Sequence, residues 1–304
     1  MYKQYHGKVI LFGEYSMIFG SEALLMPYNS VYGEWNSVIN RPSERAYESN
    51  REIRKFYDYL RNDDGFRILD LRRFEMELDA GLYFDSNIPL GYGVGSSGAL
   101  VAAIYDRYKL IDINDISKQK DFLAKMESFF HGNSSGIDPL QCYIGKPFIL
   151  SQRVESQSQR LTTKVLNDDF ISDDIHIFLI DTKIKSPTAP LVEHFKELRK
   201  DNSYLRKFDN EYVPLVSKCI DTLINKDDDF LPHLSHLSRL QLELLSHTIP
   251  DDFKEYFLKN INEDGFQVKL CGAGGGGYLL GFSNNINKTN DYWDNINKKI
   301  MWIR

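Results

Sequence analysis

The stretch Pro89–Gly98 reads Pro-Leu-Gly-Tyr-Gly-Val-Gly-Ser-Ser-Gly, and the alanine-rich segment after it, Ala99–Tyr108, predicts a helix. Glycines allow unusual backbone angles and a close approach of the chain to a ligand. The start of a helix offers unpaired N–H groups and the positive end of the helix dipole, which suits phosphate. Ser96 and Ser97 add hydroxyls that cap the helix, bind phosphate or ligate magnesium. The pattern favours a phosphate-binding loop without a lysine over a plain strand-to-helix turn capped by serine.

The loop is not well explained by either of two common nucleotide-binding motifs. The P-loop pattern is absent, because no lysine follows these glycines. The dinucleotide pattern GxGxxG fits at Gly93–Gly98, but it fits again at Gly272–Gly277. The second match precedes a strand-like Tyr-Leu-Leu, and the first has no clear strand immediately before it. An NAD-dependent dehydrogenase is therefore the weaker alternative.

Composition narrows the class of protein. The chain has 304 residues, of which 42% are hydrophobic and 13% aromatic, so it has enough apolar material for a core. Its net charge of −6 and the lack of a basic patch argue against a nucleic-acid partner. No apolar run approaches the roughly 20 residues that span a bilayer. The chain has three cysteines, which are Cys142, Cys219 and Cys271. They are far apart in the sequence, which argues against disulfides and thiolate zinc sites. We expect a cytoplasmic protein without membrane partners.

Hydrophobic periodicity predicts a mixture of strands and helices without strict alternation, which favours an α+β fold. In Phe74–Ala80, apolar and acidic residues alternate, and this period of two predicts a half-buried strand. The polar stretch Gln152–Asp169 is the expected crossover between two domains. Further strands are expected at Lys8–Phe12, Lys146–Leu150, His176–Thr182, Phe266–Cys271 and Tyr278–Phe282, and helices at Asp121–Phe130, through most of Ala189–Leu258 and at Ile286–Met301.

Two acids are candidates for phosphoryl-transfer chemistry, which needs a metal against the phosphates and often a carboxylate near the attacking hydroxyl. Glu127 lies late in a predicted helix, and Asp138 follows the turn His131–Gly136. Pro139 also predicts a simpler role for Asp138 as a helix N-cap. Glu127 alone would be a surface residue, and His131 would be a turn or core histidine.

Two further features lie at opposite ends of the chain. Lys8 begins an apolar strand; it is either a solvated lysine at the edge of a sheet or a cation beside phosphate. The run Gly272–Gly277 joins two predicted strands and has more glycine than a hairpin needs. Close approach of this backbone to a ligand or to another loop explains the run better.

Together these motifs resemble the GHMP kinases. His6–Tyr15 is similar to the opening strand of that superfamily, Gly91–Gly98 to its ATP-binding loop, and Lys269–Gly277 to its C-terminal glycine motif. The three occur in the same order as in the superfamily. The resemblance implies a two-domain α+β fold with the active site in the interdomain cleft. It suggests an ATP-binding domain at residues 1–155 and a second domain at 156–304.

Within the superfamily, Glu127 and the segment His131–Asp138 look like the mevalonate kinase family. This resemblance implies ATP- and Mg²⁺-dependent phosphorylation of the 5-hydroxyl of mevalonate, and it suggests a homodimer. Asp138 and Lys8 would be catalytic, and Ser97 and Glu127 would hold the metal. The ATP-binding residues would be Gly91, Gly93, Val94, Gly95, Ser96, Ser97 and Gly98, and those near the substrate Glu14, Tyr15, Thr182, Ala273 and Gly274.

The chain departs from the family pattern before Lys8, where His6 replaces the proline of Ala-Pro-Gly-Lys, and at two further positions. Tyr15 stands where mevalonate kinases usually have histidine, and Ser134 replaces the proline of the HGNPSG segment. The alternatives are a GHMP kinase for phosphomevalonate, a sugar or homoserine, and a catalytically inactive family member that binds a ligand.

Overall fold

The computed structural model describes residues 3–38, 43–155, 158–186 and 188–304. The chain forms two compact units, and each is described separately. Unit 1 comprises Met1–Lys8, Pro27–Pro89 and Val94–Gly145. Unit 2 comprises Val9–Met26, Leu90–Gly93 and Lys146–Arg304. Both units are assembled from separate segments of the chain, and the division into domains after residue 155 stays a prediction.

Strands β1 (Gln4–Phe12) and β2 (Ala23–Ser37) each contribute residues to both units. They belong to a sheet with the order β1-β2-β4-β5, in which β3 (Leu82–Ser86) also pairs with β2. In unit 1, Gly33–Ser37 of β2 runs antiparallel to β3. In unit 2, Ala23–Leu25 of β2 pairs with β4 (Phe148–Glu155).

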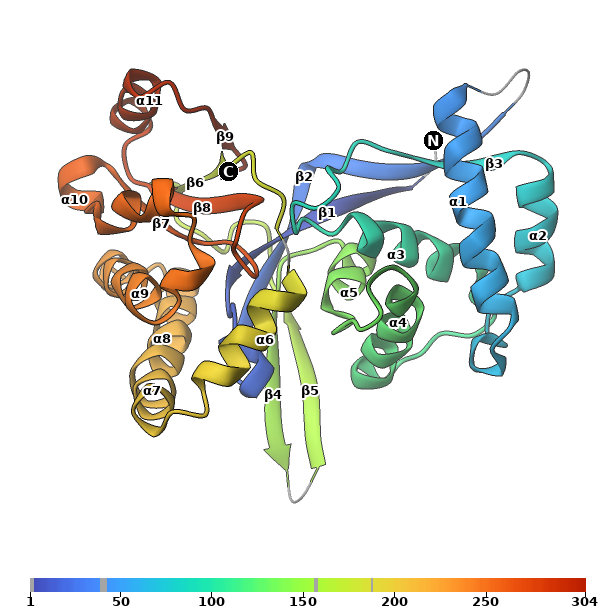
Figure 1. The fold of residues 1–304 in the computed structure, drawn as a ribbon, viewed down its shortest axis with the longest axis horizontal. Coiled ribbons are helices and arrows are strands. Elements are labelled where there is room, and N and C mark those ends of the chain that lie inside the picture. Colours follow the sequence, from blue (N-terminus) through green and yellow to red (C-terminus); the bar gives the residue numbers. More distant parts are fainter. Residues whose placement is uncertain (1–2, 39–42, 156–157, 187) are drawn as a thin grey trace. The chain divides into compact units, whose positions relative to one another are not determined.

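The helices of unit 1 are α1 (Glu44–Arg61), α2 (Leu71–Asp79), α3 (Ser96–Tyr108), α4 (Ile116–His131) and α5 (Ile137–Ile144). The sequence begins these helices locally: Ser43 caps α1 by accepting from the N–H of Ala46, and Asp115 caps α4 by accepting from Lys118. Within unit 1, α3 packs against α4 and α5, and Figure 1 shows these three helices grouped together. This grouping brings the ends of three helices near one another.

The strand predicted at Phe74–Ala80 is wrong, because these residues lie mostly in helix α2. Asp70 caps this helix by accepting a hydrogen bond from the N–H of Arg73. Phe74 and Leu78 are buried, whereas the side chain between them in the alternating pattern, Met76, is 63% exposed. Positions four apart share a face of a helix, and here that spacing decides which apolar residues reach the core.

Unit 2 contains a second sheet, in the order β7-β8-β6-β9, with antiparallel pairing throughout. Its strands are β6 (His176–Asp181), β7 (Phe266–Leu270), β8 (Tyr278–Ser283) and β9 (Ile300–Trp302). Its helices are α6 (Thr188–Leu198), α7 (Asn202–Lys207), α8 (Val213–Asn225), α9 (Phe230–Leu244), α10 (Ile261–Asp264) and α11 (Ile286–Asn295). A π-helical turn at Phe208–Tyr212 joins α7 to α8. The 3-10 helices lie at Ser16–Phe19, Ser246–Thr248 and Asp251–Leu258 in this unit and at Asp64–Phe66 in unit 1.

Two predicted segments of unit 2 differ from the structure. The polar stretch Gln152–Asp169 is largely a hairpin, because β5 (Ser158–Val165) pairs antiparallel with β4. The last helix ends at Asn295, and the apolar Ile300–Trp302 forms strand β9 on β6. In both cases pairing with a neighbouring strand, which is not visible locally, determines the conformation.

The mixed architecture of helices and antiparallel sheets confirms the predicted α+β class. Within the part of the chain that the structure describes, no helix is both long and apolar enough to cross a membrane.

Candidate functional site

Lys8 and Asp138 form an ion pair within unit 1, with 2.9 Å between Nζ and Oδ1. Lys8 is only 4% exposed, so its ammonium is largely removed from water. The Asp138 side chain is 31% exposed and can reach a ligand. Lys8 is therefore not the solvated edge residue that its position alone suggested. The arrangement is a shielded cation beside an accessible carboxylate.

The local sequence explains how Asp138 reaches this place. The N-cap of α5 is Gly136, with a left-handed φ of 74°, so the predicted N-cap role of Asp138 is wrong. Asp138 lies instead in the first turn of α5, where the helix dipole favours a negative charge. Gly98 of α3 lets this turn approach closely, because a Cβ there would lie 2.8 Å from the carbonyl carbon of Asp138. The glycine thus brings the start of α5 against the start of α3.

Glu127 is buried, at 4% exposure, and is not the surface residue that its helix position suggested. Its Oε1 accepts a hydrogen bond from Ser97 Oγ at 2.8 Å, and its Oε2 accepts one from Ser134 Oγ at 2.5 Å. Burial, followed by the negative charge of Asp138, raises the pKa of Glu127 to about 7, although the two serines and Lys8 act in the opposite direction. Binding of a proton or a cation would remove the free-energy cost of holding this negative charge in a buried place next to Asp138.

The glycine-serine loop ends in an open helix start. Gly95 is the N-cap of α3, with a φ of 81°, and no side chain caps the helix there. Neither serine fills that role: Ser96 and Ser97 are the first two residues of α3. The first N–H groups of a helix have no intrahelical acceptor, so this end suits an anion.

The rest of the loop is held by its backbone. The carbonyl of Val94 accepts a hydrogen bond from the N–H of Lys8 at 2.9 Å. A Cβ on Gly95 would meet the Lys8 side chain at 3.0 Å, which ties this part of the loop to β1 within unit 1. Gly91 and Gly93 belong to unit 2 and have φ angles of 79° and 70°. A Cβ on Gly93 would meet nothing within 4 Å, so its positive φ, and not crowding, requires glycine.

His131 makes a contact that the sequence analysis missed. Its Nε2 lies 2.9 Å from Ser97 Oγ, although the sequence suggested only a turn or core histidine. Ser134, noted only as a departure from the family pattern, hydrogen-bonds Glu127 as described above. The spacing of Glu127 and His131, four residues apart on one helix, was the signal that they share a face.

Glu14 forms an ion pair with Lys269 in unit 2, with 2.5 Å between Oε1 and Nζ and no exposure of either side chain. Lys269 also donates to the carbonyl of Leu270 at 2.5 Å, and Tyr212 donates to the carbonyl of Glu14 at 3.3 Å. The carboxylate of Glu14, expected near the substrate, therefore lies in the core of unit 2. Its contacts anchor the end of β1 to β7.

Tyr15, also in unit 2, donates a hydrogen bond of 2.6 Å to the carbonyl of Ala273. Its ring lies 4.6 Å from that of Phe195 in α6, and burial raises the pKa of the phenol. Its φ of 61° is unusual for a bulky residue. Tyr15 and Ala273, two of the predicted substrate residues, are thus in direct contact.

The glycine run of unit 2 packs against other backbone. A Cβ on Gly274 would lie 2.3 Å from the carbonyl oxygen of Thr248, and one on Gly277 would lie 2.7 Å from that of Tyr92. The carbonyl of Gly277 accepts hydrogen bonds from the N–H of Thr182 at 3.0 Å and from its hydroxyl at 2.7 Å. Close approach to other loops, one of the two explanations that the sequence offered, therefore accounts for these glycines.

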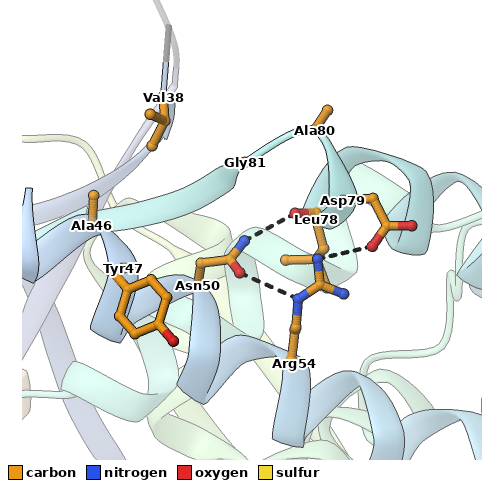
Figure 2. Close-up of a pocket in the computed structure, with 9 residues that line it drawn as sticks. All are labelled: Val38, Ala46, Tyr47, Asn50, Arg54, Leu78, Asp79, Ala80 and Gly81. Carbon is orange, nitrogen blue, oxygen red and sulfur yellow. Dashed lines mark hydrogen bonds and ion pairs between the residues drawn. The ribbon is translucent and has the colours of Figure 1, made fainter. Parts of the chain in front are cut away.

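Figure 2 shows a separate pocket of about 280 Å³ between α1 and α2 in unit 1. In its wall, Arg54 forms an ion pair with Asp79 at 2.8 Å and donates to Asn50, which donates to the carbonyls of Leu78 and Leu82. These polar groups satisfy one another. None of the predicted site residues lines this pocket, so we assign it no role in the chemistry.

Several known proteins are similar to this chain. Residues 53–146 match the family described as GHMP kinases N terminal domain. The mevalonate kinase of Archaeoglobus fulgidus is 25% identical over 285 residues, which cover 90% of this chain and 89% of that protein. The mevalonate kinase of Pyrococcus abyssi is 33% identical over 161 residues, 45% of this chain and 47% of that protein.

Solved structures show the same fold. The crystal structure of L. major mevalonate kinase in complex with R-mevalonate has a TM-score of 0.68 at 20% identity, covering 99% of this chain and 94% of that one. Streptococcus pneumoniae phosphomevalonate kinase has a TM-score of 0.63 at 14% identity, covering 99% and 98%. The sequence motifs, the fold and the match of residues 53–146 to the GHMP kinase N-terminal domain agree, and we conclude that this chain is similar to the GHMP kinases and is an ATP-dependent kinase of a small molecule.

Proposed function

We propose that this kinase phosphorylates the 5-hydroxyl of mevalonate to give 5-phosphomevalonate. The two curated relatives are mevalonate kinases, and one of them is similar along most of both chains. The single observation that carries the proposal is the cluster of Lys8, Asp138, Glu127 and Ser97 at the start of α3. A shielded cation, an accessible carboxylate, a second acid and an open helix start are the parts that phosphoryl transfer needs.

In the proposed reaction, the open start of α3 and the backbone of the glycine-serine loop bind the phosphates of ATP. The acceptor hydroxyl oxygen forms a bond to the γ-phosphorus as the bond from that phosphorus to the β,γ-bridging oxygen breaks. ADP leaves, and Asp138 takes the proton of the hydroxyl. Lys8 orients Asp138 and stabilises the negative charge of the transferring group.

Ser97 and Glu127 fit a site for Mg²⁺, an ion that prefers oxygen ligands and usually keeps one or two carboxylates among them. The hydroxyl and the carboxylate lie 2.8 Å apart, and burial of Glu127 disfavours a bare negative charge there. When bound, Mg²⁺ would neutralise charge on the phosphates. Ser134 holds the other oxygen of Glu127 and so orients the carboxylate.

On the substrate side, we propose that Tyr15, Thr182, Ala273 and Gly274 shape the acceptor site of unit 2, with Glu14 acting through its ion pair with Lys269. Tyr15 contacts Ala273, and Thr182 contacts the same glycine run at Gly277. The buried pair keeps the ends of β1 and β7 in place. Glu14 is in this proposal a positioning residue.

An acceptor panel tests the proposal. The purified chain is given ATP and Mg²⁺ with mevalonate, phosphomevalonate, galactose or homoserine, and ADP release is followed in a coupled assay. We expect turnover with mevalonate. Turnover only on another acceptor would replace the substrate, and ATP binding without turnover on any acceptor would support an inactive, ligand-binding family member.

A further inference from the structure

The hydroxyl of Ser97 has two partners in unit 1. Its Oγ lies 2.8 Å from Oε1 of Glu127 and 2.9 Å from Nε2 of His131. A serine hydroxyl carries one proton and two acceptor lone pairs. While Ser97 donates to Glu127, the second contact is a hydrogen bond only if Nε2 of His131 carries a proton and donates to Ser97.

Cation binding would change this pattern. A carboxylate and a hydroxyl that both ligate Mg²⁺ direct lone pairs at the ion, as proposed above for Glu127 and Ser97. The Ser97 proton then points away from the ion and needs another acceptor. Neutral histidine supplies one, because its two tautomers place the proton on either ring nitrogen.

We propose that His131 is a positioning residue that accepts the Ser97 proton when Ser97 and Glu127 hold a divalent cation. With the histidine proton on Nδ1, Nε2 accepts the hydrogen bond from Ser97 and keeps the serine oxygen turned toward the ion. The exchange of donor and acceptor leaves the net charge of the site unchanged. This inference rests on the proposed function, because it assigns a partner to one of the proposed metal ligands.

The fold explains why this histidine is available. His131 is the last residue of α4, and Gly132 after it has a φ of 71°, which ends the helix. Glu127 lies one turn earlier and therefore on the same face. His131 is exposed, so water can satisfy Nδ1 in either tautomer. One end of α4 thus offers both a buried acid and a partner with donor and acceptor capacity to the start of α3.

Three variants of the full chain separate this role from simple space filling. His131→Ala removes the ring, His131→Leu replaces it with an apolar side chain that cannot hydrogen-bond, and His131→Gln keeps both a donor and an acceptor. The measured quantity is the Mg²⁺ concentration needed for half-maximal enhancement of ADP binding, by calorimetry at one pH. We expect this Mg²⁺ concentration to rise about 10-fold in the Ala and Leu variants, because loss of the partner of a metal ligand usually weakens metal binding by about 10- to 100-fold. In the Gln variant the rise should be less than about 3-fold, because the hydrogen bond is kept. Binding of ADP without metal should not change.

His236→Ala, an exposed histidine of α9 in unit 2, is the matched control and should behave like the wild type. Thermal unfolding checks that each variant is folded. Unchanged Mg²⁺ dependence in the Ala and Leu variants would overturn the inference, and so would a Gln variant as impaired as Ala. If the wild-type chain bound no nucleotide, the proposed function would fail. That outcome is distinct from failure of the inference, in which the wild type binds nucleotide and the His131 variants keep its Mg²⁺ dependence.

Discussion

The side chains of Lys8 and Asp138 meet at 2.9 Å and join strand β1 to the first turn of α5. The lysine is buried and the aspartate is partly open to solvent. An ammonium in this position holds the carboxylate in one orientation, with its accessible side free to accept a proton. The pair links the fold of unit 1 directly to the proposed chemistry.

Asp138→Asn should lower kcat by about 10²- to 10⁴-fold, because the amide cannot accept the hydroxyl proton. The affinity for ATP should remain, since the open helix start of α3 is unaltered. Steady-state kinetics and calorimetric titration measure the two quantities. Asp121→Asn, on an exposed part of α4 with 66% of its side chain accessible, is the control. Near-normal turnover of the Asp138→Asn variant would remove Asp138 from the mechanism.

Glu127→Gln should change how stability depends on pH. The folded pKa of about 7 lies above the ordinary 4.5, so folding favours the protonated carboxyl. Its contribution to stability is therefore fully present below about pH 4.5 and is lost as the pH rises through about 7. Relative to the Glu127→Gln variant, the wild type should lose up to about 3 kcal/mol of unfolding free energy across this window.

Urea unfolding at several pH values, without Mg²⁺, measures this difference. Glu193→Gln, on the exposed side of α6, is a suitable control. The trend with pH is the informative quantity, because the substitution also alters the hydrogen bonds from Ser97 and Ser134. Parallel pH profiles for the wild type and the Glu127→Gln variant would contradict a buried carboxyl with a raised pKa.

Gly98→Ala should be destabilising by about 1–3 kcal/mol, although alanine normally favours a helix over glycine. The added Cβ would lie 2.8 Å from the backbone of Asp138 and 2.9 Å from that of Pro139. Turnover should also fall, because α5 must shift and carry Asp138 with it. Thermal melts and kcat at a temperature where the protein is folded test both effects.

Gly145→Ala separates these effects from a general cost of replacing glycine. Gly145 has a φ of 64°, but a Cβ there would meet nothing within 4 Å. This variant should lose some stability through backbone strain and keep its kcat. Loss of turnover in both variants to the same extent would show that the contact of Gly98 with Asp138 is not the cause.

The buried pair of Glu14 and Lys269 should show strong coupling. Glu14→Leu or Lys269→Met alone should cost about 3–5 kcal/mol, because each leaves a charge without its partner in the core of unit 2. The double variant should be much less destabilised than the sum of the two. Denaturant unfolding of the four proteins gives the coupling energy, and additive effects would contradict a direct pair.

The local sequence pattern identified some of the helices and strands and missed others. Strands with apolar runs, such as the segments that became β6 and β8, were identified because their patterns are strong. Helix α2 was misjudged because an alternating pattern also contains residues four apart, and here Phe74 and Leu78 share the buried face of a helix while Met76 is exposed. The long strand β2 and helix α1 were not predicted, although α1 buries Ile53, Phe56, Tyr57 and Leu60 at helical spacing. Spacing alone does not identify the surface on which a segment will pack.

From the sequence by itself came the glycine-serine loop before a helix, the glycine run and the candidate acids, because backbone freedom and turn formation depend on neighbouring residues. That no side chain caps the helix after the loop was decided by the structure. The tertiary structure alone decided that Lys8 pairs with Asp138, that Glu127 is buried and accepts hydrogen bonds from two serines, and that Glu14 forms an ion pair with Lys269. These contacts join residues remote in the chain. Their existence depends on how helices and strands pack, and packing is a property of the whole set of side chains.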